Sequence, residues 1–191
     1  QQHNKPLMIS ECGFSYTSAA GGDQTAYAAD QLNKLYSYAN MIFPQTKAVF
    51  YFDKDMSGSA YHYALSGSST LASTYESAIQ ANGSYLKAGQ TSAPAWTALS
   101  NVSQGQGRIQ LATYAVFPSS AATTVTYYVD GKAVYSSSKA PYYYTLDCDA
   151  LSSGSHKLYV IATNGKFTVN GSASGKTYTI QTQESEGYHP S

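Results

Sequence analysis

The sequence predicts two units of different fold class, an α/β unit followed by an all-β unit. Between Pro6 and Leu86, short apolar runs alternate with segments in which apolar residues recur every three or four positions, which is typical of strands and helices in turn. Beyond residue 95 the apolar period changes to two, and turn residues separate short strand-like segments. We therefore expect a first unit at 1–88, a linker at 89–95, a second unit at 96–183 and a tail at 184–191.

The first unit is expected to contain two strands, each followed by a helix. The continuous apolar runs Leu7–Ile9 and Ala48–Phe52 are typical of strands buried on both faces. Asp23 is a candidate cap for the first helix, and Pro44 should stop it. Its apolar face is Ala28, Leu32, Leu35, Ala39 and Ile42; that of the second helix is Leu71, Tyr75, Ala78 and Ile79, with Asn82-Gly83 as its end. This strand-helix-strand order predicts that the two strands are parallel.

The second unit is expected to be a β-sandwich, because many short strands separated by turns occur within about 90 residues. Asp130-Gly131 is a favoured two-residue hairpin turn. The expected strands are Trp96–Val102, Arg108–Phe117, Thr123–Val129, Lys132–Ser136, Tyr142–Leu146, Lys157–Thr163 and Lys176–Thr182. A disulfide between Cys12 and Cys148 is not expected, because the two cysteines fall in different units.

Composition narrows the class of partner. The formal net charge is zero and only 12% of residues are charged, which argues against nucleic acid or an anionic membrane surface as a partner. No run approaches the roughly 20 apolar residues that a membrane span needs. The four histidines, His3, His62, His156 and His189, have no metal-ligand spacing, so we expect no metal and no cofactor. The 19 tyrosines suit either exposed strand faces or sugar binding, and the first interpretation is the simpler one.

Glu11 ends the first expected strand in an unusual way for a buried segment. A carboxylate at the carboxyl end of a parallel strand lies where α/β barrels keep catalytic groups. Such a residue can equally cap the following loop or pair with a lysine, and position alone does not separate these interpretations.

The segments around both expected strands resemble a known enzyme family. KPLMISECG, the later TKAVFYFDKD and the helix ending in NGSYL are similar to the last two βα units of retaining (β/α)8-barrel glycoside hydrolases, most closely family 26, the β-mannanase-like group. The resemblance implies that this part is the last quarter of a TIM barrel and that Glu11 is the catalytic nucleophile. It places Tyr16, Tyr51, Phe52 and Asp53 at the substrate-binding edge. The general acid/base of that family comes from an earlier strand, which would precede Gln1.

The second unit resembles a bacterial immunoglobulin-like module found in secreted carbohydrate-active enzymes. The matching residues are Val125–Lys132, Ala140–Tyr142, Asp147 and Gly154–Ala162. The resemblance implies a spacer or stabilising role, and some such modules bind sugars.

Together these resemblances imply the C-terminal portion of a secreted or cell-surface bacterial endo-hydrolase that cuts a β-glycan of the mannan type. A quarter of a barrel leaves open strand edges and a bare sheet face. We therefore expect a separate N-terminal barrel fragment, self-association, or packing of the first unit on the sandwich as a degenerate remnant to cover them. We expect no activity from this chain alone. The alternative is a non-catalytic module that binds a polysaccharide or spaces domains.

Overall fold

The computed structural model describes residues 5–81, 83–92, 96, 99, 107–117, 121–165, 168–170 and 178–182. The chain divides into two compact units, Gln1–Thr97 and Ala98–Ser191, and each is described by itself. Within the described residues, no helix has both the length and the apolar character needed to cross a membrane. Cys12 and Cys148 are both free thiols.

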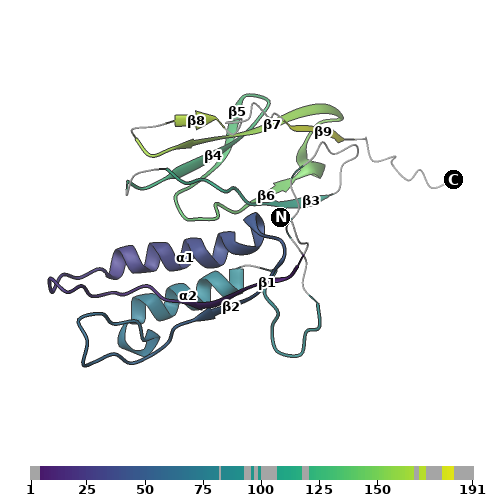
Figure 1. Ribbon diagram of the computed structural model, residues 1–191. Helices are drawn as coiled ribbons and strands as arrows, with labels where there is room; N and C mark the ends of the chain where they lie inside the picture. The colour runs from purple at the N-terminus through teal and green to yellow at the C-terminus, as the bar shows by residue number, and fades with distance from the viewer. Residues whose placement is uncertain are drawn as a thin grey trace. The chain divides into compact units, whose positions relative to one another are not determined.

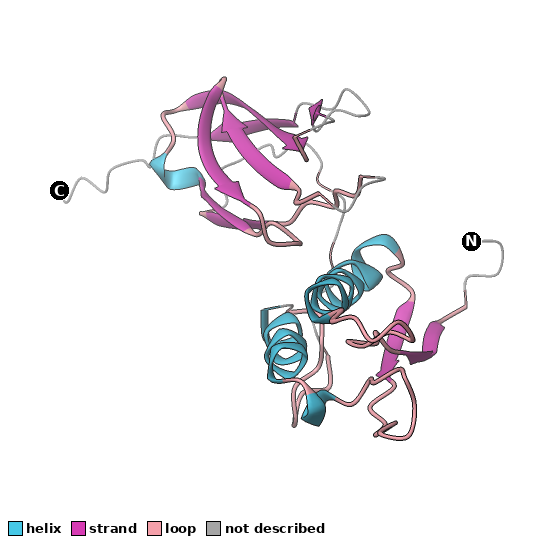
Figure 2. Cartoon of the chain, turned by 90° about the vertical axis from the view of Figure 1, so that its left-hand side faces the viewer, coloured by secondary structure: helices cyan, strands magenta, loops and turns pink. Residues whose placement is uncertain are grey.

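The first unit contains two strands and two longer helices in alternation. Its elements are β1 (Leu7–Cys12), α1 (Thr25–Ile42), β2 (Thr46–Tyr51), the short 3-10 helix η1 (Leu65–Gly67) and α2 (Ser69–Ala81). The prediction of parallel strands is confirmed, with Met8 opposite Ala48 and Ile9 opposite Val49. Both helices lie on the same side of the strand pair (Figures 1 and 2).

The core of the first unit lies between this sheet face and the helices. Ala28, Leu32 and Tyr36 of α1 pack against Leu71 and Ala78 of α2. Val49 and Tyr51 of β2 are among the half-buried side chains that pack against this cluster. The predicted faces are correct at Ala28, Leu32, Leu71 and Ala78, whereas the buried Tyr36 was not predicted and the predicted Ile42 is 39% exposed.

The expectation that both strands are buried on both faces is wrong. The side chains of Met8 and Phe50 are 62% and 54% exposed. Strand residues alternate between faces, and the helices cover only the face that Val49 and Tyr51 occupy. The opposite face carries Met8 and Phe50, and neither helix of the first unit packs on it.

The ends of α1 differ slightly from the expected ones. The residue before the helix is Gln24, whose side chain makes no capping bond. Asp23 lies one position earlier, and its carboxylate accepts a hydrogen bond from the Thr25 amide at 2.8 Å. The helix ends at Ile42, two residues before Pro44, as expected from the missing N–H of proline.

The second unit consists of two antiparallel sheets. The strands are β3 (Arg108–Leu111), β4 (Thr124–Val129), β5 (Lys132–Ser137), β6 (Tyr144–Asp147), β7 (Gly154–Thr163), β8 (Thr168–Asn170) and β9 (Tyr178–Thr182), with a 3-10 turn η2 (Cys148–Ala150). β3 pairs with β6, and the other sheet has the order β5-β4-β7-β8. β9 pairs with the first half of β7, whereas β8 pairs with its second half. The expected strand at 96–102 lies largely outside the described residues, the one at 108–117 ends at Leu111, and β8 was not expected.

Alternation along β4 builds the core of the second unit. Val125, Tyr127 and Val129 are buried, and the Tyr127 hydroxyl donates to the Tyr142 carbonyl oxygen at 2.8 Å. Burial raises the pKa of Tyr127 to about 12. The predicted turn at Asp130-Gly131 is confirmed, because both residues have positive φ values, 51° and 81°, as a type I′ turn requires.

Candidate functional site

The carboxyl ends of β1 and β2 meet at one edge of the first unit. The strands are parallel, so the segments that follow them leave the sheet on the same side. The Phe52 amide donates to the Cys12 carbonyl oxygen at 2.6 Å, which joins the two strand ends. Glu11 and Asp53 each lie one residue from this link, so the predicted site residues are brought to one edge.

Glu11 is exposed at the end of β1. Its neighbour Cys12 contacts Tyr36 of α1, and the pairing with β2 is irregular between Ile9 and Cys12, so Glu11 lies at a break in the regular alternation of the strand. Within the described part of the chain, the Glu11 carboxylate has no hydrogen-bond or ion-pair partner. The simpler interpretations, a loop cap or a pair with lysine, are therefore not realised among these residues.

Tyr16 holds two loops together. Its half-buried ring packs against the helical core and contacts the His62 ring edge-on, with ring centroids 5.9 Å apart. Its hydroxyl lies directly over Gly67, where any Cβ would overlap it. Tyr16 thus has a packing role between the loop after β1 and the η1 turn, whatever else it contacts.

Tyr51 likewise has a packing role in the first unit. It packs against the core cluster, and its hydroxyl donates to the Tyr63 carbonyl oxygen at 3.0 Å. Burial raises the pKa of Tyr51 to about 12, so the hydroxyl stays protonated at neutral pH. Its structural role is to anchor the loop that carries Tyr63.

Phe52 and Tyr63 form an aromatic corner beside Gly13. Their rings meet edge to face, with centroids 5.5 Å apart. A Cβ on Gly13 would lie 3.1 Å from Cδ1 of the Tyr63 ring and 3.2 Å from Cβ of Phe52, so the absence of a side chain at Gly13 lets both residues approach the strand end. Both rings are half-buried, which leaves part of each accessible. Phe52 was predicted from the sequence but Tyr63 was not, because eleven positions separate the two and only the folded loop joins them.

Asp53 is exposed but engaged on one side. Its Oδ1 atom accepts a hydrogen bond from the Leu65 amide at 2.7 Å and so holds the start of η1. Asp55 makes a similar local bond with the Ser57 amide at 2.9 Å. Asp53 keeps its second oxygen for other contacts, while Asp55 shapes its own turn.

His62 ties the two loops at the strand ends together. Its backbone amide donates to both Ser15 Oγ and Thr17 Oγ1, each at 3.0 Å, and its carbonyl oxygen accepts from the Tyr16 amide at 3.0 Å. The Thr17 hydroxyl in turn donates to the Ala60 carbonyl oxygen at 2.7 Å. The sequence gives no simple signal for this tie, since its partners lie more than 40 residues apart, 47 for Ser15 and 45 for Thr17.

Cys12 does not have the environment of a reactive thiol. Burial raises the pKa of the Cys12 thiol, and this effect exceeds the opposing hydrogen bond with Tyr36. The sulfur donates to the Phe50 carbonyl oxygen at 3.1 Å. Among the described residues, no group of three or more His, Cys, Asp or Glu side chains is placed to hold a metal ion.

Comparison with known proteins gives a partial picture. A family described as "Bacterial Ig domain" matches residues 95–160, which lie mostly in the second unit. A search of curated proteins found no match. Fibronectin(III)-like modules of Clostridium thermocellum CbhA are 23% identical, with 46% of this chain and 92% of that chain covered and a TM-score of 0.35.

Two weaker structural neighbours are glycoside hydrolases. The endo-β-1,4-mannanase from Thermotoga petrophila is 12% identical over 95% of this chain and 40% of that chain, with a TM-score of 0.35. A Bacteroides uniformis β-glucuronidase is 13% identical over 93% of this chain and 22% of that chain, with a TM-score of 0.29. This chain thus spans less than half the length of either enzyme. Because the TM-scores are below 0.5, these likenesses carry no conclusion about fold or activity.

Proposed function

We propose that this chain is the C-terminal portion of a secreted or cell-surface bacterial hydrolase that cuts β-glycans of the mannan type with retention of configuration, and that Glu11 is its nucleophile. The observation that carries the proposal is the position of Glu11. Its exposed carboxylate lies near the end of a parallel strand and has no partner among the described residues. A barrel hydrolase requires its nucleophile at such a strand end.

Under this proposal, the chain supplies one of the two catalytic carboxyl groups. A retaining glycosidase uses two carboxyl groups about 5–5.5 Å apart, one attacking the anomeric carbon and the other protonating the leaving oxygen. Glu11 would take the first role. The resemblance to the β-mannanase-like family places the second carboxyl on a strand that precedes Gln1, so this chain alone should not turn over substrate.

The proposed binding roles are not equal among the predicted residues. Phe52, with Tyr63, offers partly exposed apolar ring surface next to Gly13, and Asp53 offers one oxygen that Leu65 does not occupy. Sugar rings stack on such aromatic surfaces through their C–H faces. Tyr16 and Tyr51 are engaged in holding the loops, so we assign them a supporting role at the same edge.

The bare face of the β1–β2 pair supports an incomplete barrel. Met8 and Phe50 expose 62% and 54% of their area on the face that would line a barrel interior. Exposed apolar strands with open edges favour pairing with further strands. We propose that preceding barrel strands cover this face, and that self-association of the chain replaces them when they are absent.

The first experiment is native mass spectrometry of the purified protein. A co-purifying N-terminal piece of roughly 200 residues, the size of six βα units, would give a complete barrel to assay. The assembled protein is then treated with a 2-deoxy-2-fluoro-mannoside that carries a good leaving group, which traps the glycosyl-enzyme intermediate. We expect the added mass on the peptide that contains Glu11, and loss of labelling and hydrolysis in Glu11→Gln.

A matched control is Glu76→Gln, which makes the same chemical change on the exposed surface of α2. This variant should label and hydrolyse like the unmodified protein. Label on another carboxylate, or normal turnover by Glu11→Gln, would overturn the assignment of the nucleophile.

A second candidate function, glycan binding by the second unit, rests on one different observation. Tyr128 of β4 and Tyr159 of β7 are half-buried and stacked, with centroids 5.0 Å apart and planes 3° from parallel. Within the described residues, neither hydroxyl has a hydrogen-bond partner. The test is retention of the protein on insoluble mannan or cellulose. Binding by the second unit is supported if Tyr128→Ala abolishes retention and Tyr27→Ala, which changes an exposed tyrosine of α1, does not. Lack of retention on either polysaccharide would instead favour the spacer role.

A further inference from the structure

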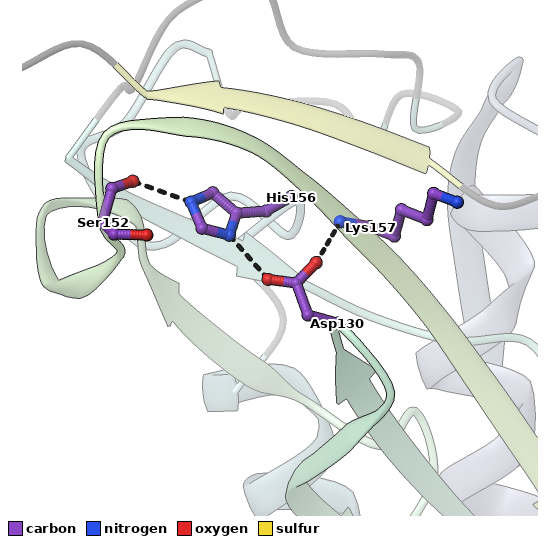
Figure 3. A network of polar contacts seen from close by, with 4 residues as sticks. All are labelled: Asp130, Ser152, His156 and Lys157. Carbon is purple, nitrogen blue, oxygen red and sulfur yellow. Dashed lines mark hydrogen bonds and ion pairs between the residues drawn. The ribbon is translucent and has the colours of Figure 1, made fainter.

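His156 occupies an unusual position at one end of the second unit. It lies near the start of β7 and is 7% exposed. Its Nδ1 atom lies 2.7 Å from Oδ2 of Asp130, in the turn between β4 and β5. Its Nε2 atom lies 2.7 Å from the Ser152 carbonyl oxygen, in the loop before β7 (Figure 3). One ring therefore bridges a hairpin turn and a loop.

Both partners of the ring are hydrogen-bond acceptors. A carboxylate and a backbone carbonyl oxygen have no proton to give at neutral pH. A neutral imidazole carries one N–H and can satisfy only one of them, whereas the imidazolium carries two and satisfies both. With a neutral ring, one nitrogen lone pair would face an oxygen atom at 2.7 Å.

The Asp130 carboxylate is held in place from the other side. Its Oδ1 atom accepts from the Lys157 amide at 2.8 Å, and the Asp130 amide donates to the Lys157 carbonyl oxygen at 2.9 Å. Asp130 also has a φ of 51°, fixed by the tight turn. The carboxylate therefore cannot easily turn away from the ring when the ring loses its proton.

Few other charges act on this ring among the described residues. Lys157, which follows His156 on β7, interacts with Asp130 through its ammonium group, and Ser152 is neutral. In the segment before β7, Asp147 pairs with Arg108 at 3.2 Å and Asp149 lies near Gly107. β9 pairs with His156 through Ile180, which is uncharged. Asp130 is thus the charged group in direct contact with the imidazole.

We propose that His156 is a pH-sensitive lock, in which the charged imidazolium fastens both the Asp130-Gly131 turn and the Ser152 loop to β7, and loss of its proton releases one of them. This device belongs to the second unit and is independent of the proposed hydrolase function. It makes the stability of the module depend on pH in a range where most protein groups do not titrate.

The sign of the effect follows from linkage. The Asp130 hydrogen bond and the Ser152 carbonyl raise the pKa of His156 above its ordinary value of 6.5. The folded state thus holds the proton more tightly, so the stabilisation is complete below about pH 6.5 and is lost as the pH rises through the raised pKa. The hydrogen bond with His156 lowers the pKa of Asp130. The stabilisation that ionised Asp130 contributes is therefore present above its ordinary pKa of 3.8 and is lost as the pH falls through the lowered pKa.

The test is a nitrogen-detected NMR titration of the whole chain. We expect both ring nitrogens of His156 to show the shifts of an imidazolium at pH 6.5, and the Ser152 carbonyl carbon to move with the same midpoint as the ring. Asp130→Asn should lower that midpoint. A neutral His156 ring at pH 6.5 in the unmodified protein would overturn the proposal. A titration midpoint that Asp130→Asn leaves unchanged would also overturn it.

Urea unfolding followed by signals of the second unit gives an independent readout. Between the unfolded and folded pKa values of one histidine, the folding equilibrium constant should fall by up to about tenfold per pH unit. This slope should persist in His62→Gln, which alters a histidine of the first unit, and disappear in His156→Gln. A slope that survives His156→Gln would show that another group is responsible.

Discussion

The Phe52 amide donates to the carbonyl oxygen of Cys12 at 2.6 Å, as the last backbone link between the two parallel strands of the first unit. This bond fixes where the loops after β1 and β2 begin, one residue after Glu11 on one side and one residue before Asp53 on the other. The positions of the candidate site residues therefore depend on the packing of these loops, and several predictions concern that packing.

Replacing Gly67 by alanine should destabilise the first unit, because the new Cβ would overlap the Tyr16 hydroxyl. Overpacking of this kind typically costs about 1–3 kcal/mol in the free energy of unfolding. Gly58→Ala is the control, since nothing lies within 4 Å of a Cβ there. In the double variant with Tyr16→Phe the hydroxyl is absent, so much of the lost free energy of unfolding should be recovered. If the losses of the two single variants simply add in the double variant, the Tyr16 hydroxyl is not what the new Cβ overlaps.

Ser15 and Thr17 should be partly redundant, because both hydroxyls accept from the His62 amide. Each single change, Ser15→Ala or Thr17→Val, leaves one acceptor for the amide but removes the bond that the hydroxyl donates to the Thr17 or Ala60 carbonyl oxygen, and should cost about 0.5–1.5 kcal/mol. The double variant leaves a part-buried amide unpaired, at a further cost of about 1–3 kcal/mol. Thermal unfolding of all three variants provides the measurement, and a loss equal to the sum of the single losses would argue against a shared role.

The core of the first unit should be sensitive at Leu32, which has no exposed surface. Leu32→Ala removes methyl and methylene groups between α1 and α2 and should cost about 2–5 kcal/mol. Leu86→Ala serves as the matched control, because Leu86 is 56% exposed, and should stay within about 0.5 kcal/mol. Equal effects of both variants in chemical unfolding would contradict the assigned core.

The second unit should lose stability at strongly alkaline pH in part through Tyr127. Its folded pKa is raised to about 12, above the ordinary value of 10. The unfolded state therefore releases this proton first, so the stabilisation is present below pH 10 and is lost as the pH rises toward 12. Tyr127→Phe should flatten the dependence of unfolding on pH in this window, whereas Tyr61→Phe, an exposed tyrosine of the first unit, should leave it unchanged.

The exposed strand face should promote association of the chain when nothing else covers it. Phe50→Ser removes a side chain that is 54% exposed on this face, and should shift sedimentation profiles toward the monomer. Tyr27→Ser removes an aromatic side chain of similar exposure, 60%, on α1 and should not. If the unmodified chain is already monomeric at high concentration, the proposed self-association is refuted.

Sequence patterns predicted the order of the main elements of the first unit and the Asp130-Gly131 turn because these depend on residues close together in the chain. They predicted the parallel pairing because a strand-helix-strand order favours it. The same patterns predicted burial of Met8 and Phe50 incorrectly. An apolar run indicates side chains that are suited to burial, but not which layer covers them.

The candidate site was predictable only at Glu11 and its strand-end neighbours, all of which rest on local motifs. Tyr63 and His62 could not be assigned in the same way, because their contacts depend on how a loop returns to the strand ends. The double hydrogen bond of His156 was hidden for the same reason, since two separate turns supply its acceptors.

The tight turn between β4 and β5 also implies an order of folding events. Only two residues separate these strands, so their pairing closes a very short loop, whereas Asp130 and His156 are 26 positions apart. Closing a longer loop costs more chain entropy, which favours early hairpin formation and later docking of β7. Contacts that form after the rate-limiting step of folding affect the unfolding rate more than the folding rate. The imidazole bridge should therefore act chiefly on how long the folded module lasts, rather than on how fast it is reached.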